Sequence, residues 1–170
     1  MNQFAPLWND WLEEHGPRLL LFARQQTRCE ADAEDVLQTA LVKTLQVHRR
    51  EPDQRVLSLV YTNIRRCAID LSRQLDRRKK RETDHATEQG PAVAWFELPE
   101  DDTARALQVA LTKIPDTFRE VITLKIWGDQ TFDEVGKALS ISPHTAASRY
   151  RYGMEALRKS LASEKAEIGF

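Results

Sequence analysis

Residues 131–157 read TFDEVGKALSISPHTAASRYRYGMEAL and predict two short helices joined by a tight turn. Thr131 and Glu134 have the spacing of a capping box, so one helix should begin there. Ser142 followed by Pro143 predicts the N-cap and the first residue of a second helix. This stretch constrains the fold more than any other because it specifies both helices and the turn between them.

The two helices differ in the side chains that they carry. Apolar residues at helical spacing predict the packed sides, namely Val135, Ala138 and Leu139 on the first helix and Ala146, Tyr150, Gly153 and Leu157 on the second. The other sides of the second helix carry His144, Thr145, Ala147, Ser148, Arg149 and Arg151. A polar, basic helix braced on another helix can enter the major groove of DNA. Helix pairs also occur in proteins that bind no DNA, so this pattern indicates DNA binding without establishing it.

The rest of the chain is predicted to be all-α. It has 170 residues, enough for one ordinary domain or two small helical ones. Only 6 glycines and 7 prolines argue against a loop-rich β architecture, and sustained alternation of apolar and polar residues is absent. A hydrophobic content of 41% suffices for globular cores.

Charge is segregated along the chain although the net charge is only −1. Residues 65–81 hold eight basic and two acidic side chains, a net charge of +6. Residues 82–102 hold seven acidic side chains and no Lys or Arg. Such blocks predict a phosphate-facing surface followed by an acidic connector.

The two cysteines, Cys29 and Cys67, form neither a CxxC motif nor a disulfide framework. Neither has enough neighbouring His or Cys to suggest a zinc site, and we expect no metal and no cofactor. The longest apolar run, residues 19–23, is too short for a membrane span or the core of a signal peptide. A soluble, cytoplasmic protein without membrane insertion is expected.

The first half of the chain predicts three or four helices. A segment over residues 4–28 has an expected break at Gly16-Pro17. Asp32 is the expected N-cap of a helix that runs to Val47. Its predicted apolar stripe consists of Val36, Leu37, Ala40, Leu41, Thr44 and Leu45. A loop over residues 49–55 and a long helix over residues 56–80 follow, whose inward residues should be Val56, Val60, Ile64, Ala68 and Leu71.

The second half predicts a separate helical domain. One helix carries Ala104, Leu107, Leu111 and Ile114, and a second begins at Pro115 and carries Phe118, Val121, Ile122 and Ile126. Residues 82–100 contain Gly90-Pro91 and Pro99 without helical periodicity and predict a linker between domains over 1–81 and 101–165. An apolar cluster at residues 93–98 either packs on one domain or binds a partner.

Three blocks of this sequence resemble the conserved regions of bacterial sigma factors. They are ADAEDVLQTALVKTL (31–45), VYTNIRRCAIDLSRQLDRR (60–78) and residues 111–159, which include the helix pair. Their order, the short connector and the size are similar to the extracytoplasmic-function group. The resemblance implies a dissociable subunit of core RNA polymerase that recognises promoter DNA. Its first domain would bind the polymerase clamp and the downstream promoter element, and its second the flap and the upstream element.

The resemblance also implies residue roles. The helix over residues 32–47 corresponds to the clamp-binding region, with Asp35, Gln38, Thr39 and Leu41 as the candidate contacts, although Leu41 also fits a core position. The region that opens and reads the downstream element corresponds to residues 61–73, with Tyr61, Asn63, Arg65 and Arg66 as candidates for an unstacked base and its phosphates. Arg66 departs from an Asn that is common in the family, and the loop 49–55 lies where the family holds a flipped base. Unspecific phosphate contacts are expected from Arg73, Arg77, Arg78, Lys79 and Lys80.

The recognition helix of the family corresponds to the second helix of the pair. Its candidate contacts with the upstream element are His144, Thr145, Ser148, Arg149 and Arg151. Arginine reads guanine and also binds phosphate, so the sequence does not sort Arg149 from Arg151. Ala147 departs from a frequent Lys, which removes one DNA contact.

Two other functions fit the sequence less well. An enzyme is disfavoured because no nucleophile elbow, phosphate-binding glycine loop or HExxH motif is present. A stand-alone helix-turn-helix regulator would not require the blocks at 31–45 and 60–78. The family is generally controlled by anti-sigma proteins, so the resemblance also implies a protein regulator.

Overall fold

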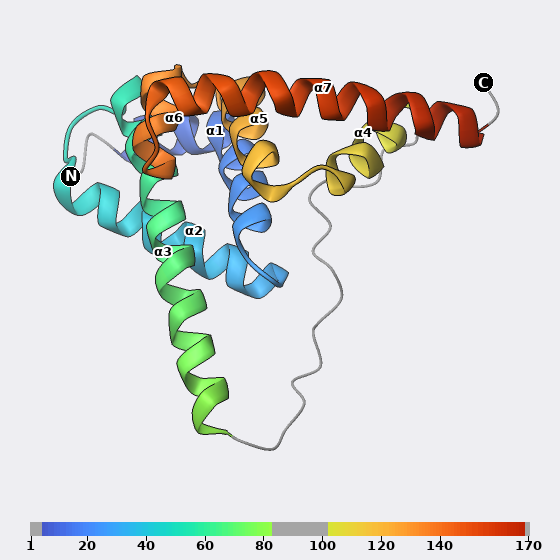
Figure 1. Cartoon of the computed structure of the whole chain (residues 1–170). Helices are drawn as coiled ribbons and strands as arrows, with labels where there is room; N and C mark the ends of the chain where they lie inside the picture. Colours follow the sequence, from blue (N-terminus) through green and yellow to red (C-terminus); the bar gives the residue numbers. More distant parts are fainter. Residues whose placement is uncertain (1–4, 83–101, 169–170) are drawn as a thin grey trace. The chain divides into compact units, whose positions relative to one another are not determined.

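The computed structural model describes residues 5–82 and 102–168, which form seven α-helices and no strand (Figure 1). The chain divides into two compact units, Met1–Trp95 and Phe96–Phe170. The all-α prediction is confirmed. The expected linker over 82–100 and the apolar cluster at 93–98 lie almost wholly outside the described residues, and the domain limits 1–81 and 101–165 remain a prediction.

Three helices form the first unit: α1 (Ala5–Gln26), α2 (Glu30–Val47) and α3 (Gln54–Arg81). Each packs on the other two. Large side chains in their core include Trp8, Trp11, Leu19, Phe22, Leu57, Tyr61 and Ile64. The C-terminal part of α3 runs beyond α1 and α2 in Figure 1, and from Arg73 to Arg81 almost every side chain is exposed.

The expected break at Gly16-Pro17 is wrong, because α1 is one continuous helix that contains Pro17. Proline removes one backbone donor from a helix. Buried residues on both sides of it, Trp11 before and Leu19 after, lie on the same packed face. Tertiary packing of that face keeps the two halves in one helix.

The expected starts of the next two helices also need correction. The N-cap of α2 is Cys29 and not Asp32, and the Ala33 N–H donates to the Cys29 carbonyl at 3.1 Å. Arg24 holds the carboxylate of Glu30 in the first turn, with Nη2 and Oε1 2.7 Å apart, so the helix begins before Asp32. The cap of α3 is Asp53, whose Oδ1 accepts from the Val56 N–H at 3.0 Å, and the preceding loop therefore ends there.

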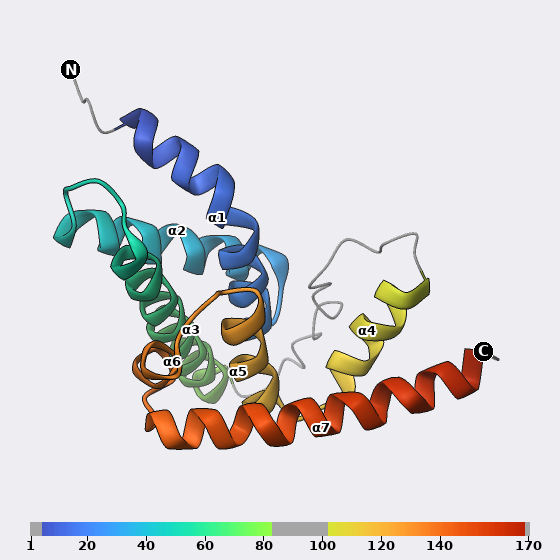
Figure 2. The ribbon, with the colours of Figure 1, turned by 90° about the horizontal axis from the view of Figure 1, so that it is seen from above.

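Four helices form the second unit: α4 (Asp102–Lys113), α5 (Asp116–Ile126), α6 (Phe132–Leu139) and α7 (Pro143–Ile168). Along α7, α5 and α6 lie beside the first half and α4 beside the second (Figure 2). A buried Glu164 pairs with Lys113 and joins the far end of α7 to α4. Ile126, the last residue of α5, is 45% exposed.

A buried arginine closes the corner between α4 and α5. Arg119 Nε donates to the Leu111 carbonyl at 2.9 Å, and its Nη2 donates to the Ile114 carbonyl at 2.9 Å. Its Nη1 lies 2.9 Å from Asp116 Oδ1. The last carbonyls of a helix lack partners within the helix, so this side chain completes the end of α4. No local pattern in the sequence distinguishes Arg119 from an exposed arginine.

The helix pair at residues 131–157 has the predicted starts and turn, but the second helix is not short, because α7 continues to Ile168. Thr131 and Glu134 form both hydrogen bonds of the capping box at the start of α6. The turn bends at Ser140, which has a φ of 57°. A Cβ on Gly136 would lie 2.7 Å from the Ile141 carbonyl oxygen, so the close turn requires glycine there.

Candidate functional site

The first turn of α7 is held by Ser142. Its Oγ accepts from the Thr145 N–H at 3.0 Å and donates to Thr145 Oγ1 at 2.8 Å. These contacts place Thr145, a predicted DNA contact, in the cap of the helix. Its hydroxyl retains the capacity to donate to a further acceptor.

The two sides of α7 are clearly distinguished by burial. Ala146, Gly153 and Leu157 are buried against the rest of the unit. Helical spacing places His144, Ser148 and Arg151 on the opposite side, where His144 and Arg151 are exposed and Ser148 is half-buried.

Arg149 and Tyr150 lie closer to the packed side of α7. Arg149 is half-buried. Tyr150 is also half-buried, and its ring lies edge-on to that of Phe132 on α6, with 5.8 Å between the centroids. The amino group of Lys125 lies 4.6 Å from the centroid of the Phe132 ring. The expected core role of Tyr150 agrees with these contacts, which connect α5, α6 and α7.

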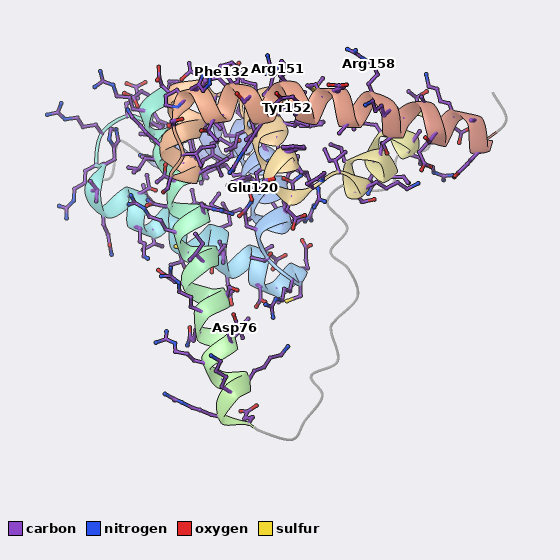
Figure 3. The ribbon with its side chains drawn as sticks, viewed as in Figure 1. Asp76, Glu120, Phe132, Arg151, Tyr152 and Arg158 are labelled. Carbon is purple, nitrogen blue, oxygen red and sulfur yellow. The ribbon has the colours of Figure 1, made fainter. Side chains whose placement is uncertain are left out.

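Tyr152 is a further candidate, absent from the residues predicted above. It lies on the outward side of α7 and is 52% exposed (Figure 3). Arg151 Nη2 donates to its hydroxyl at 3.2 Å, and the guanidinium carbon lies 4.9 Å from the centroid of its ring. The signal that could have found it is its position four residues after Ser148, where a large aromatic side chain has no place in the predicted core.

The prediction that Tyr61 contacts an unstacked base is wrong for this structure. Tyr61 is 1% exposed, and its ring lies edge-on to Phe22 with 5.4 Å between centroids. Burial raises the pKa of its phenol well above the ordinary value. Helical spacing places Tyr61 on the same face of α3 as Leu57 and Ile64, which fills the core.

The next two polar candidates on α3 also contact other helices. Asn63 Nδ2 donates to Thr44 Oγ1 on α2 at 3.0 Å. Arg65 Nη1 donates to Gln26 Oε1 on α1 at 2.6 Å. Both side chains are half-buried, whereas Arg66 is exposed.

The basic C-terminal part of α3 presents its charges to solvent. Arg73 and Arg77 are exposed, and Arg77 Nε donates to the Arg73 carbonyl at 3.3 Å. Asp76 forms an ion pair with Arg28, which follows α1, at 3.5 Å (Figure 3). Arg78 pairs with Glu82 at 3.2 Å, and Lys79 and Lys80 are exposed. The pair with Arg28 offsets the charge of Asp76, which is one of the two acidic side chains in the basic block over residues 65–81.

The outward side of α2 holds most of the predicted clamp contacts. Asp35, Gln38 and Thr39 are exposed, and Leu41 is half-buried. Val42 is 51% and Leu45 is 40% exposed, so the expectation that Leu45 lies in the core is wrong. Helical spacing places Asp35, Gln38, Val42 and Leu45 in one stripe, opposite the buried Ala33, Val36, Ala40 and Thr44. We call the exposed set, Asp35, Gln38, Val42 and Leu45, the α2 stripe.

Features of other kinds of site are absent from the part of the chain that the structure describes. No group of three or more His, Cys, Asp or Glu is placed to hold a metal ion in residues 5–82 and 102–168. Over the same residues, every helix is too short or too polar to cross a bilayer. Cys29 and Cys67 are free thiols.

Comparison with known families gives one match in each unit. Residues 11–78 match Sigma-70 region 2, and residues 110–159 match Sigma-70, region 4. The first range includes α2 and nearly all of α3. The second includes α5, α6 and the first part of α7.

Several bacterial proteins are similar over most of the chain. The RNA polymerase sigma factor CarQ of Myxococcus xanthus is 31% identical over 165 residues, which cover 95% of this chain and 92% of that protein. The ECF RNA polymerase sigma factor SigW of Bacillus subtilis is 29% identical over 145 residues, covering 76% of this chain and 75% of that protein. Among solved structures, the sigma factor RpoE of Bartonella quintana, crystallised with the anti-sigma factor NepR, shares the fold. Its TM-score is 0.65 at 18% identity, over 91% of this chain and 96% of that one.

Proposed function

The chain belongs to the extracytoplasmic-function group of bacterial RNA polymerase sigma factors, and from this premise we propose how its two units share promoter recognition. It is an alternative sigma factor that directs promoter-specific transcription. In our proposal the first unit binds the clamp of core RNA polymerase and opens the downstream promoter element. The second unit binds the flap and reads the upstream element as closed duplex.

The division rests chiefly on one observation: each of the two compact units carries one of the two sigma regions and presents its own exposed helix face. In the first unit, the α2 stripe combines Asp35 and Gln38 with the exposed apolar Val42 and Leu45. Exposed apolar side chains rimmed by polar ones are typical of protein interfaces. We assign this stripe, with Thr39 and Leu41 at its flanks, to the polymerase clamp.

The DNA contacts follow from exposure and charge. On α3 we assign Arg66, Arg73 and Arg77 to DNA, with Arg66 nearest the strands that separate and the other two on phosphates. Asn63 and Arg65 act mainly within the helical bundle, where they bond Thr44 and Gln26. On α7 we assign the outward His144, Ser148 and Arg151 to the upstream element. Thr145 contributes through its hydroxyl, and Arg149 lies at the margin of the interface.

Reconstituted transcription tests this function directly. Core RNA polymerase with the full chain should start transcripts at promoters found by chromatin mapping of the tagged protein, and core enzyme alone should not. A gel-shift assay distinguishes a sigma factor from a stand-alone helix-turn-helix regulator. Such a regulator would bind the same duplexes tightly without core enzyme. Tight binding without core enzyme, together with no transcription in its presence, would refute the proposal.

The proposal extends to a non-enzymatic, cytoplasmic protein that an anti-sigma factor keeps inactive. Support comes from the similar fold of RpoE, which was crystallised with such a factor, and from the exposed apolar residues of α2. Purification of the tagged chain followed by mass spectrometry tests it. We expect polymerase subunits and one stoichiometric regulator, and recovery of polymerase alone under all growth conditions would contradict the regulated state.

A further inference from the structure

Two neighbouring side chains on the outward side of α7 form a unit that the proposed function does not explain. Arg151 Nη2 donates to the Tyr152 hydroxyl at 3.2 Å, and the guanidinium carbon lies 4.9 Å from the centroid of the Tyr152 ring. A cation at this distance over an aromatic face is attracted by the ring quadrupole. One hydrogen bond and one stacking contact therefore hold the same guanidinium.

Both side chains of the pair are exposed, so their contact needs an explanation other than packing in a core. Arg151 is exposed and Tyr152 is 52% exposed, so burial does not account for the order between them. A free arginine side chain on a helix surface samples many rotamers, and fixing it costs conformational entropy when a ligand binds. The contacts with Tyr152 favour one rotamer of Arg151, and this would lower that entropic cost.

We propose that Tyr152 is a positioning residue that orients Arg151 for the upstream promoter element. This inference rests on the proposed function of the second unit. The hydrogen bond uses only part of the donor set of the guanidinium, and the other N–H groups remain to bind acceptors. The unit therefore takes an acceptor-bearing DNA site, which is either the O6 and N7 edge of guanine or a phosphate.

The orientation of these side chains also distinguishes Arg149 from Arg151 as the DNA contact on α7. Arg149 is half-buried towards the packed side, whereas the Arg151–Tyr152 unit stands beside Ser148 on the outward side. Tyr152 acts through Arg151, so loss of the ring should produce the same kind of defect as loss of the guanidinium, only smaller. This relation separates a positioning role from a second, independent DNA contact.

The test uses the full chain assembled with core RNA polymerase. Wild-type holoenzyme first selects its preferred upstream element from a pool of double-stranded DNA randomised over that element. The selected duplex is then the binding probe for Arg151→Ala, Tyr152→Ala, Tyr152→Phe and the double alanine variant. Arg158→Ala is the matched control, because Arg158 is an exposed arginine on the same helix, outside the unit (Figure 3).

We expect Arg151→Ala to lower the affinity roughly tenfold, the effect of losing one good DNA contact. Tyr152→Ala should lower the affinity about fivefold. Tyr152→Phe should have a smaller effect because the ring remains, and Arg158→Ala should leave the affinity nearly unchanged. The double variant should be no weaker than Arg151→Ala alone, since Tyr152 has nothing left to orient.

Repeating the selection with the single variants identifies the ligand. If Arg151 reads guanine, Arg151→Ala and Tyr152→Ala relax the same single base position. If it binds a phosphate, the selected sequence stays unchanged and Arg151→Ala lowers the salt slope by about one unit.

Two results would overturn the proposal while leaving the function of the chain intact: unchanged binding by Tyr152→Ala, or defects of the two alanine variants that add and affect different base positions. A wild-type holoenzyme that selects no sequence would instead refute the proposed function and this inference together.

Discussion

The side-chain amide of Asn63 on α3 donates a hydrogen bond to the Thr44 hydroxyl on α2 at 3.0 Å. Thr44 is fully buried, and its hydroxyl donates a hydrogen bond to the Ala40 carbonyl at 2.8 Å. This chain of hydrogen bonds fastens the helix assigned to DNA to the helix assigned to the polymerase clamp. A polar residue predicted to contact a promoter strand thus has a structural partner inside the bundle.

We therefore expect Asn63→Ala to destabilise the first unit by about 1–2 kcal/mol, because the Thr44 hydroxyl loses its donor in a buried place. Urea unfolding, followed by amide exchange in α2 and α3, measures the change. Thr39→Ala is the control, since Thr39 is an exposed residue of α2, the helix that carries Thr44. If Asn63→Ala leaves the stability unchanged but impairs promoter opening, Asn63 contacts DNA and its role in the bundle is wrong.

Arg66 and Arg65 should behave differently on promoter templates. Arg66 is exposed, so Arg66→Ala should reduce transcription from duplex DNA and largely spare a pre-melted bubble template. Arg65 bonds Gln26, so Arg65→Ala should also lower the stability of the bundle, by about 1 kcal/mol. If Arg66→Ala is equally defective on both templates, the residue captures the strand or adds general affinity and has no part in melting.

The α2 stripe makes a prediction about assembly. Val42→Asp places a charge at the centre of an exposed apolar surface and should weaken binding to core polymerase about tenfold or more, without unfolding the chain. Fluorescence anisotropy with labelled protein measures the affinity. Leu7→Asp, at another exposed apolar residue of the same unit, should bind normally. If the two substitutions weaken binding equally, the assignment of the α2 stripe to the polymerase interface is wrong.

Loss of the buried guanidinium at the α4–α5 corner should destabilise the second unit. Arg119→Met keeps the length of the side chain but leaves the carbonyls of Leu111 and Ile114 without this donor, at a cost of about 1–3 kcal/mol for each carbonyl left unsatisfied. Thermal unfolding followed by circular dichroism should show an earlier transition. Arg158→Met is the exposed control, and similar melting curves for both variants would contradict the role of Arg119.

Stability should fall in mildly acidic solution through His15 on α1. Burial lowers the pKa of His15 below its ordinary value of 6.5, although Glu14 opposes the shift. The folded chain then binds this proton more weakly than the unfolded chain, so the contribution is complete above the ordinary pKa and is lost as the pH falls through the lowered one. Unfolding between pH 7.5 and 5 should show a steeper loss for wild type than for His15→Gln. Parallel curves would exclude His15 as the cause.

Local signals allowed the helix pair to be predicted from the sequence. The Thr131–Glu134 capping box and the Ser142 cap are hydrogen bonds between residues three apart, so neighbours in the chain are enough to specify them. The acidic and basic blocks are also visible in the sequence, because each consists of residues that lie close together along the chain. The order of the three family-like blocks was sufficient to predict the family, and the helical spacing of apolar residues predicted the all-α class.

Long-range packing decided the rest. Pro17 should end a helix by its local chemistry, yet a continuous buried face carries α1 through it. Tyr61 and Leu45 each suit either a core or an interface, and the partner helices bury the first and leave the second exposed. The sequence by itself therefore determined where the helices of the DNA-binding pair begin, which family the chain resembles and where its charge lies. Only the tertiary structure decided which polar side chains remain for a partner, because a hydrogen bond such as Asn63–Thr44 depends on two helices meeting in space.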